Sequence, residues 1–213
     1  SHHSDVLELE RGFNENDLYD NLRWLSQQQA GMEKRLFQKR RGKTPPELFL
    51  YDVTSSYLEG QHNALGAYGY NRDGKHGKMQ IVIGLLCDGE GEPVSVEVFE
   101  GNTQDPKTFG AQVQKAATRF GCTQVTMVGD RGMIKRTQIA DLPEGFHYIT
   151  AITKPQIETL LQKAVFQMSL FDEALCEVEH EAVRYVLRRN PVRAQEMART
   201  RESKRHSVQA LVS

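Results

Sequence analysis

Two apolar runs in this chain end in the same way, each on an aspartate. Residues 48–51 are Leu-Phe-Leu-Tyr and lead to Asp52, and residues 124–129 are mostly apolar and lead to Asp130. A continuous apolar run of this kind predicts a strand that is buried on both faces in the middle of a sheet. A buried carboxylate is costly unless it is paired, hydrogen-bonded or bound to a metal. The two runs therefore predict two central strands whose terminal carboxylates share a metal site.

The hydrophobic pattern around these runs predicts an alternation of strands and helices. Residues 79–87 are apolar and residues 94–98 alternate valine with polar residues, which predicts an antiparallel hairpin. Beyond it the pattern predicts, in order, a helix capped by Asp105, the strand ending on Asp130, a short helix, a strand over 146–153 and a helix over 154–166. This order predicts an α/β fold in which a mostly parallel sheet contains one antiparallel strand.

A single stripe of apolar residues predicts a helix before the first run. Its members recur at three-, four- and seven-residue intervals: Leu18, Leu22, Leu25, Met32 and Leu36. Asn14 or Asn16 can cap the start of this helix, and Gly42 suits its C-cap. The basic residues 39–43 suit the negative end of the helix dipole. The narrow stripe indicates a helix that docks on one side without being buried all round.

The last fifty residues differ in character from the rest. Residues 177–189 alternate between apolar and polar, which predicts an edge strand or a hairpin. Asn190 and Pro191 then begin a predicted helix from Val192 to about His206, which is polar nearly all round and strongly basic. Residues 208–213 are apolar and carry no stop signal, so we expect the sequence to be a piece of a longer protein.

Composition is that of an ordinary protein, with 213 residues, of which 38% are hydrophobic and 26% charged. The length allows one sizeable domain with an appendage. No apolar run approaches the roughly 20 residues of a membrane span, and no signal peptide is visible, so we expect no membrane partner. The three cysteines are widely spaced, which favours a reducing cytoplasm and argues against disulfides or a structural zinc.

The formal net charge of -1 hides a strong local asymmetry. Between Arg184 and Arg205 eight cationic side chains stand against two acids, Glu196 and Glu202. This distribution permits contacts with nucleic-acid phosphates, although a solvated helix face explains it equally well.

The two aspartates carry the clearest chemical signal. Carboxylates on neighbouring strands can hold hard cations such as Mg²⁺, and a pair of such ions about 4 Å apart promotes phosphodiester displacement. Taken singly, each has a simpler explanation: Asp52 as a cap or turn residue, and Asp130 as the N-cap of the helix after it. Asp52 followed by Val53 and Thr54 is also similar to aspartyl phosphotransferases, in which the aspartate is a nucleophile.

The segment between the first run and the hairpin is rich in glycine, histidine and asparagine. It spans residues 60–77 and carries Arg72 and Lys75, with Lys78 directly after it. Because it follows the strand that bears Asp52, it is a plausible active-site loop. The histidines His62, His76 and His147 have no partner at metal-ligand spacing.

Five motifs together carry a family resemblance. They are Tyr-Asp-Val-Thr-Ser-Ser-Tyr at 51–57, Gly-Tyr-Asn-Arg-Asp-Gly-Lys at 69–75, Ile-Gly-Leu-Leu at 83–86, Glu-Val-Phe-Glu-Gly-Asn-Thr-Gln-Asp at 97–105 and Val-Gly-Asp-Arg-Gly-Met at 128–133. In this order they resemble the DDE transposases of bacterial insertion sequences, in the insertion-sequence-four superfamily with a β-rich insertion. The resemblance spans about residues 48–190.

The resemblance implies an RNase H-like mixed sheet with flanking helices that depends on Mg²⁺ or Mn²⁺ and cuts and joins DNA. By position, Asp52 and Asp130 match the first two acids of the family's catalytic triad and its metal ligands. The implied partners are the DNA of element ends and target and, in the full-length protein, a second copy; the implied location is the bacterial cytoplasm. The candidate DNA-binding residues are Arg72, Lys75, Arg131, Arg188, Arg189 and Arg193.

One departure from the family pattern concerns the third acid, a glutamate within a Tyr-Arg-Glu-Lys pattern that is not found here. Glu97, Glu100, Glu196 and Glu202 are the remaining candidates. We therefore expect a helical lead-in over 1–43, a catalytic core over 44–170 and the start of an insertion domain over 171–213. We also expect this piece alone to bind divalent ions weakly and to be inactive. A non-catalytic remnant that binds DNA or another transposase is the alternative.

Overall fold

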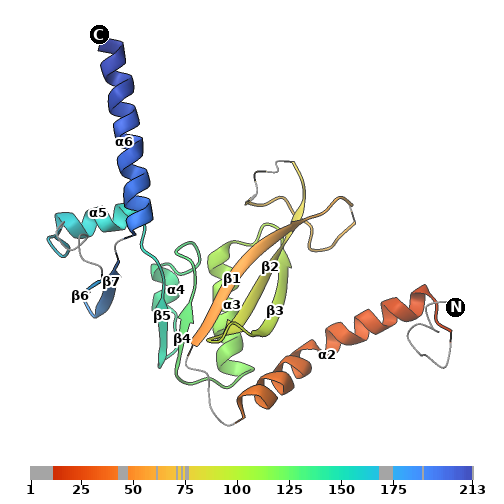
Figure 1. Cartoon of the computed structure of the whole chain (residues 1–213). Helices are drawn as coiled ribbons and strands as arrows, with labels where there is room; N and C mark the ends of the chain where they lie inside the picture. The colour runs from red at the N-terminus through yellow and green to blue at the C-terminus, as the bar shows by residue number, and fades with distance from the viewer. Residues whose placement is uncertain are drawn as a thin grey trace. The chain divides into compact units, whose positions relative to one another are not determined.

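The computed structural model describes residues 12–42, 48–60, 62–70, 72, 74, 77–167, 175–188 and 190–212. The chain divides into two compact units, Ser1–Ala151 and Ile152–Ser213, which are described separately below (Figure 1). Lys75, Arg189 and the side chain of Arg193, all predicted DNA-binding residues, lie outside the described part.

A five-stranded mixed sheet forms the first unit. Its strands are β1 (Leu48–Tyr57), β2 (Gln80–Asp88), β3 (Pro93–Glu100), β4 (Val125–Val128) and β5 (Phe146–Ile149). Their order across the sheet is β3-β2-β1-β4-β5. β1, β4 and β5 run parallel, and β2 is antiparallel to both of its neighbours. The predicted α/β fold with one antiparallel strand is therefore confirmed, and this strand order is RNase H-like.

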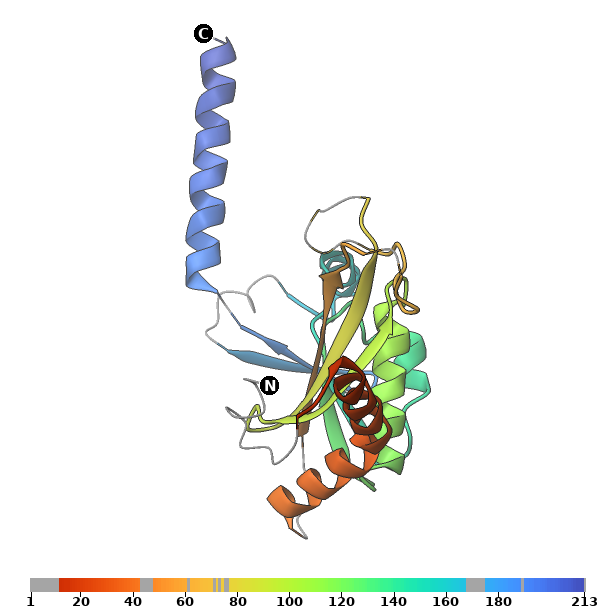
Figure 2. The same ribbon diagram turned by 90° about the vertical axis from the view of Figure 1, so that its right-hand side faces the viewer.

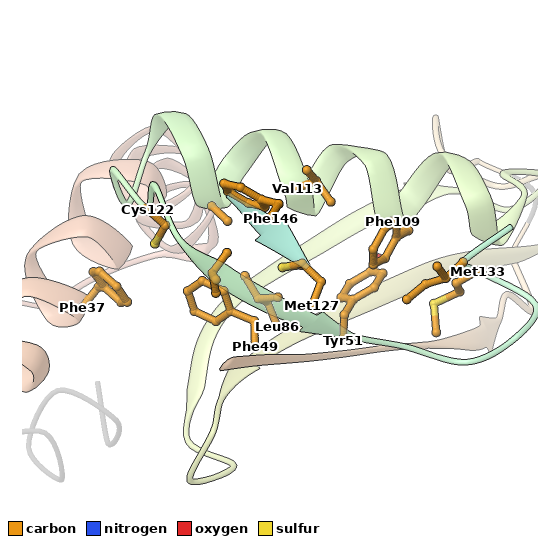
Figure 3. Close-up of a cluster of buried hydrophobic side chains, with 13 residues drawn as sticks. Phe37, Phe49, Tyr51, Leu86, Phe109, Val113, Cys122, Met127, Met133 and Phe146 are labelled. Atoms are coloured by element: carbon orange, nitrogen blue, oxygen red, sulfur yellow. The ribbon is translucent and has the colours of Figure 1, made fainter. Parts of the chain in front are cut away.

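The helix α3 (Asp105–Thr118) covers one face of this sheet (Figure 2). Its apolar residues pack on the buried side chains of β1, β2 and β4, as Figure 3 shows. Phe49, Phe109 and Met127 have no exposed surface at all. Each such side chain contributes about 1.5–3 kcal/mol by burial, so this layer holds the strands in register.

The other face of the sheet is only partly covered by the described residues of the unit. Along β1, Phe49 and Tyr51 are buried, whereas Leu48 and Leu50, which alternate with them, are half-buried. Leu85 on β2, which pairs with Asp52, is 41% exposed. The prediction of a strand buried on both faces is therefore wrong, because α3 packs against one face alone.

The helix α2 (Glu15–Arg41) begins and ends where the sequence predicts. Asn14 caps it by accepting hydrogen bonds from the N–H groups of Asn16 and Asp17, and Gly42 forms its C-cap with a φ of 60°. Only its C-terminal half docks on the sheet. Phe37 packs against Phe120 with ring centroids 4.6 Å apart, while Leu18, Leu22, Leu25 and Leu36 of the predicted apolar stripe stay exposed.

The turn between β2 and β3 is organised by Asp88. Its Oδ1 accepts hydrogen bonds from the N–H groups of Glu90 and Glu92, both at 3.0 Å, and its Oδ2 lies 3.0 Å from the Arg41 guanidinium. Burial raises the pKa of the Asp88 carboxyl, but these hydrogen bonds and the nearby cation outweigh burial and lower it overall.

The second unit contains a helix, a hairpin and a further long helix. These are α5 (Lys154–Gln162), β6 (Cys176–His180), β7 (Val183–Leu187) and α6 (Pro191–Val212). The hairpin confirms one of the two alternatives predicted for this segment, and its turn residues Glu181 and Ala182 both have positive φ, as tight hairpin turns require. The described side chains of α6 are exposed along its whole length, which extends six residues past the predicted end at His206.

Two shorter elements end earlier than predicted: β5 stops at Ile149 and α5 at Gln162. The short helix α4 (Arg136–Ala140) lies between β4 and β5. No helix in the described part of the chain is long and apolar enough to cross a membrane.

Candidate carboxylate site

Asp52 lies in β1, and Asp130 lies just past the end of the adjacent parallel strand β4. The register pairs Leu50 of β1 with Val128 of β4, and each aspartate lies two residues further along its own chain. Adjacent strands are about 4.8 Å apart, so the two carboxylates start from neighbouring points of the backbone. Both line one hollow of about 510 Å³, together with Leu50, Tyr51, Leu85, Cys87, Gly91, Val128 and Gly129.

The sequence pattern predicts that the strand ends at Asp52, and this prediction is wrong. β1 continues for five residues to Tyr57, and Asp52 is paired with Leu85 of β2 within the ladder. What ends near Asp52 is the pairing with β4, because that strand stops at Val128. The space beside Asp52 is therefore open because β4, the neighbouring strand, is only four residues long. An explanation of Asp52 as a helix cap or turn residue is wrong.

Tyr51 fixes the direction in which Asp52 points. Neighbouring side chains of a strand point to opposite faces, and the Tyr51 side chain is buried on the face covered by α3, with its ring 6.5 Å from that of Phe109. Its hydroxyl passes over Gly84, where an added Cβ would lie 2.3 Å from that oxygen. Burial raises the pKa of Tyr51 to about 12, so it stays a neutral core residue. Asp52 is thereby directed to the open face and is exposed.

Asp130 lies in a tight turn that the core holds in place. Its Oδ1 accepts a hydrogen bond from the N–H of Gly132 at 2.8 Å, and its carbonyl accepts from the N–H groups of Met133 and Ile134. Met133 and Ile134 are buried, while Asp130 and Arg131 are exposed. Since α4 begins six residues later, with Lys135 as its N-cap, the explanation of Asp130 as a helix cap is wrong.

Arg72 and Asp105 form an ion pair next to this turn. The Arg72 guanidinium donates one hydrogen bond to the Ser55 hydroxyl at 2.6 Å and another to the Asp105 carboxylate. The predicted capping role of Asp105 is wrong: Gln104 is the N-cap of α3, and Asp105 is its first helical residue. A Cβ added at Gly132 would lie 3.7 Å from Asp130 Oδ1 and 3.8 Å from Asp105 Oδ2, so the two carboxylates flank this glycine.

The donor set fits a hard divalent cation in its chemistry. Asp52 Oδ1 accepts a backbone hydrogen bond from Val53 at 2.8 Å, as Asp130 does from Gly132, and no cation of the described residues forms an ion pair with either carboxylate. Exposed carboxylate oxygens of this kind are the ligands that Mg²⁺ and Mn²⁺ take in proteins.

A third protein ligand is not found among the residues that the structure describes, where no group of three His, Cys, Asp or Glu side chains could hold a metal ion. Glu97, one of the remaining candidates, faces α3 instead. There it pairs with Lys115 at 2.7 Å and accepts a hydrogen bond from Gln112 at 2.9 Å. Burial raises the pKa of Glu97, but Lys115 and Gln112 outweigh it and lower the pKa overall.

The predicted DNA-binding residues fall into two groups. Arg72 and Arg131 belong to the first unit, next to the turn that carries Asp130. Arg188 is exposed directly after β7 in the second unit. The exposed cations of α6 include Arg199, Arg201, Lys204 and Arg205.

The first unit is thus an RNase H-like core with two exposed carboxylates where β1 passes the end of β4. The family itself follows from its sequence: a family model described as the transposase DDE domain matches residues 43–210, which is most of the chain. The chain is therefore a member of the transposase DDE family.

Two solved structures are similar to this chain. One is a cryo-EM structure of the piggyBac transposase synaptic complex with hairpin DNA, with 13% sequence identity, a TM-score of 0.43 and coverage of 70% of this chain and 32% of that chain. The other is the Mos1 transposase paired-end complex with the left transposon end. It has 8% sequence identity and a TM-score of 0.32, and the match covers 73% of this chain and 56% of that chain. The chain thus spans about a third of the first protein and just over half of the second. A comparison with curated proteins finds no match.

Proposed function

We propose that this chain supplies the first two metal ligands, Asp52 and Asp130, of a transposase that cleaves DNA strands at the ends of a mobile element and transfers them to a target. One observation carries the proposal: Asp52 in β1 and Asp130, two residues past the end of the adjacent parallel strand β4, line the same hollow. A bound Mg²⁺ or Mn²⁺ would supply activation of the attacking oxygen and stabilisation of the leaving oxygen.

The residues around the carboxylates hold them in position. On one side, the buried Tyr51 ring fixes the strand that presents Asp52. On the other, the N–H of Gly132 orients the Asp130 carboxylate, and the buried Met133 anchors the turn. Rigid support of this kind matters because ligand atoms must be placed to within about half an ångström for metal-assisted chemistry.

DNA is the partner that this role requires, and both similar structures are described as transposase complexes with DNA. In this chain Arg131 next to Asp130 and Arg188 in the second unit are exposed cations that can contact phosphates. Contacts of this type are insensitive to sequence and weaken as salt rises, by about 0.9 in the logarithmic slope for each phosphate neutralised.

Binding of Mn²⁺ to the 213-residue chain tests the proposal directly. Two carboxylates leave most coordination positions to water, so we expect weak binding, with a dissociation constant on the order of 10⁻⁴ to 10⁻³ M. Replacing Asp52 or Asp130 by Asn keeps the shape and removes the charge, and either change should abolish the binding detected by electron paramagnetic resonance. The matched control is Asp20→Asn, which removes an exposed carboxylate of α2.

Two results would contradict the proposal. Binding of Mn²⁺ that survives both Asp52→Asn and Asp130→Asn would place the ion elsewhere. Covalent labelling of Asp52 by a phosphate analogue such as beryllium fluoride would instead make Asp52 a nucleophile. Metal-dependent DNA cleavage by the chain alone, lost in Asp52→Ala, would keep the metal site and overturn the expectation that this piece is inactive.

A further inference from the structure

Tyr68 and Tyr70 are the two most exposed large apolar side chains in the described part of the chain. They are 70% and 80% exposed, and they lie in the loop between β1 and β2, at the end of the sheet where β1 finishes (Figure 1). An exposed pair of aromatic rings is costly to solvate, and aromatic side chains are the residues on which proteins stack other planar groups. The metal-site proposal leaves these two side chains unexplained.

The backbone that carries the two tyrosines is fixed to the sheet. Ala67 and Gln80 exchange two backbone hydrogen bonds of 3.1 and 3.0 Å, one residue before Tyr68. The Gln80 side chain, only 2% exposed, donates to the carbonyl of Tyr70 at 3.0 Å and to that of Gly101 at 2.8 Å. The pair is therefore presented from an anchored segment, which lowers the entropy cost of binding a ligand.

Gly69, between the two tyrosines, lies close against the backbone that follows β3. A Cβ at this position would lie 1.9 Å from the carbonyl oxygen of Gly101, so position 69 is turned towards the sheet. The segment from Tyr68 to Tyr70 forms neither turn nor helix. Tyr68 and Tyr70, on either side of Gly69, are both exposed, and two residues of chain span at most about 7 Å.

This upper limit leaves room for one nucleic-acid base between the two rings. Stacked bases follow one another about every 3.4 Å along a strand, so a gap of roughly twice that distance between two rings holds one planar base. An aromatic platform of this kind binds unpaired bases of any sequence, because every base has a stacking face. Arg72, two residues after Tyr70, is held by Ser55 and Asp105 and so anchors the segment on its other side.

We propose that Tyr68 and Tyr70 stack an unpaired base of the DNA strand on which the carboxylates act. The inference rests on the proposed function for its partner, DNA. Tyr57, the last residue of β1, pairs with Gln80, which bridges to Ala67, and Tyr57 is five residues along β1 from Asp52. That separation is about 17 Å, or roughly five nucleotides of a DNA strand. The tyrosine pair would then hold a base about five nucleotides from the reacting phosphate.

Fluorescence anisotropy with a labelled single-stranded oligonucleotide of mixed sequence, in EDTA, tests this binding without any metal. Combining Tyr68→Ala with Tyr70→Ala should weaken binding by about tenfold or more, as expected for the loss of base–aromatic stacking. Combining Tyr68→Phe with Tyr70→Phe keeps both rings and should bind within about twofold of the original chain. Tyr19→Ala, which removes an exposed tyrosine from α2, is the matched control and should have no effect.

Three outcomes would overturn the inference. They are unchanged affinity in the double alanine variant, an equal loss in the double phenylalanine variant, and an alanine effect on self-association alone, seen by size-exclusion chromatography. Circular dichroism checks that each variant is folded. Because the assay contains EDTA, it does not depend on the metal site: loss of Mn²⁺ binding in the other assay would contradict the proposed function alone, and unchanged oligonucleotide binding in the double alanine variant would contradict this inference alone.

Discussion

Glu33 joins α2 to the rest of the first unit, and replacing it by Ala should loosen that helix. The Glu33 side chain is only 7% exposed although it belongs to a surface helix. Its carboxylate pairs with Arg119 after α3, accepts a hydrogen bond from the Ser95 hydroxyl at 2.8 Å, and accepts one from the N–H of Val96 at 3.3 Å. One side chain therefore connects α2, β3 and α3.

The size of the effect follows from the burial of the partners. Removing one member of a fully buried ion pair costs about 3–5 kcal/mol, because the other charge is left uncompensated. Arg119 is 30% exposed and can regain water, which reduces that figure. The hydroxyl of Ser95 keeps a second partner, Lys115 at 2.8 Å. We expect Glu33→Ala to lower the free energy of unfolding by about 2–3 kcal/mol.

Urea unfolding followed by fluorescence reports on this region, since the single tryptophan, Trp24, lies on α2 itself. The matched control is Asp20→Ala, which breaks an ion pair with Arg23 on the same helix whose side chains are about 70% exposed. That change should cost about 0.5 kcal/mol or less. If Glu33→Ala costs no more than the control, the buried network does not hold α2, and the reasoning is refuted.

Two further predictions concern the sheet. Gly84→Ala should destabilise the fold by about 1–3 kcal/mol in urea unfolding, because the new Cβ would meet the buried Tyr51 hydroxyl at 2.3 Å; a stability equal to that of the original chain would show that Tyr51 has room to move. The lowered pKa of Asp88 stabilises the fold above the unfolded pKa of about 4, and this stabilisation is lost as the pH falls through the lower folded value. Asp88→Asn should therefore lower stability at pH 7 and flatten its decline below about pH 4, and an unchanged slope would contradict the assignment.

The sequence was sufficient for the elements whose periodicity is local. The hairpin β2–β3, the helix from Glu15 and the order of strands and helices follow from alternation, caps and turn residues that lie close together in the chain. The choice of Asp52 and Asp130 as a pair also rests on local patterns, since each aspartate ends an apolar run. Their adjacency in space is a property of the strand order, which the order of elements already restricts.

Features that depend on distant contacts could not be predicted in this way. Asp105 precedes Pro106 at a helix start, which is typical of a cap, yet its partner is Arg72, 33 positions away. Glu33 has the pattern of an exposed helix residue and is buried because Arg119, 86 positions away, supplies its charge. The one-sided burial of β1 likewise depends on which face of the sheet α3 covers, and the residues of β1 alone do not predict that face.

The arrangement of the site explains why a change in the core would reach the carboxylates. Each aspartate is exposed, but its immediate neighbours are buried: Tyr51 precedes Asp52, and Met133 follows Asp130 in the same turn. Interiors are densely packed, so a shift of either buried side chain moves the backbone that bears the carboxylate. The side of the sheet that α3 covers thus determines the geometry of the side on which the two aspartates lie. A variant such as Gly84→Ala, which touches neither aspartate, should for this reason weaken Mn²⁺ binding as well as stability.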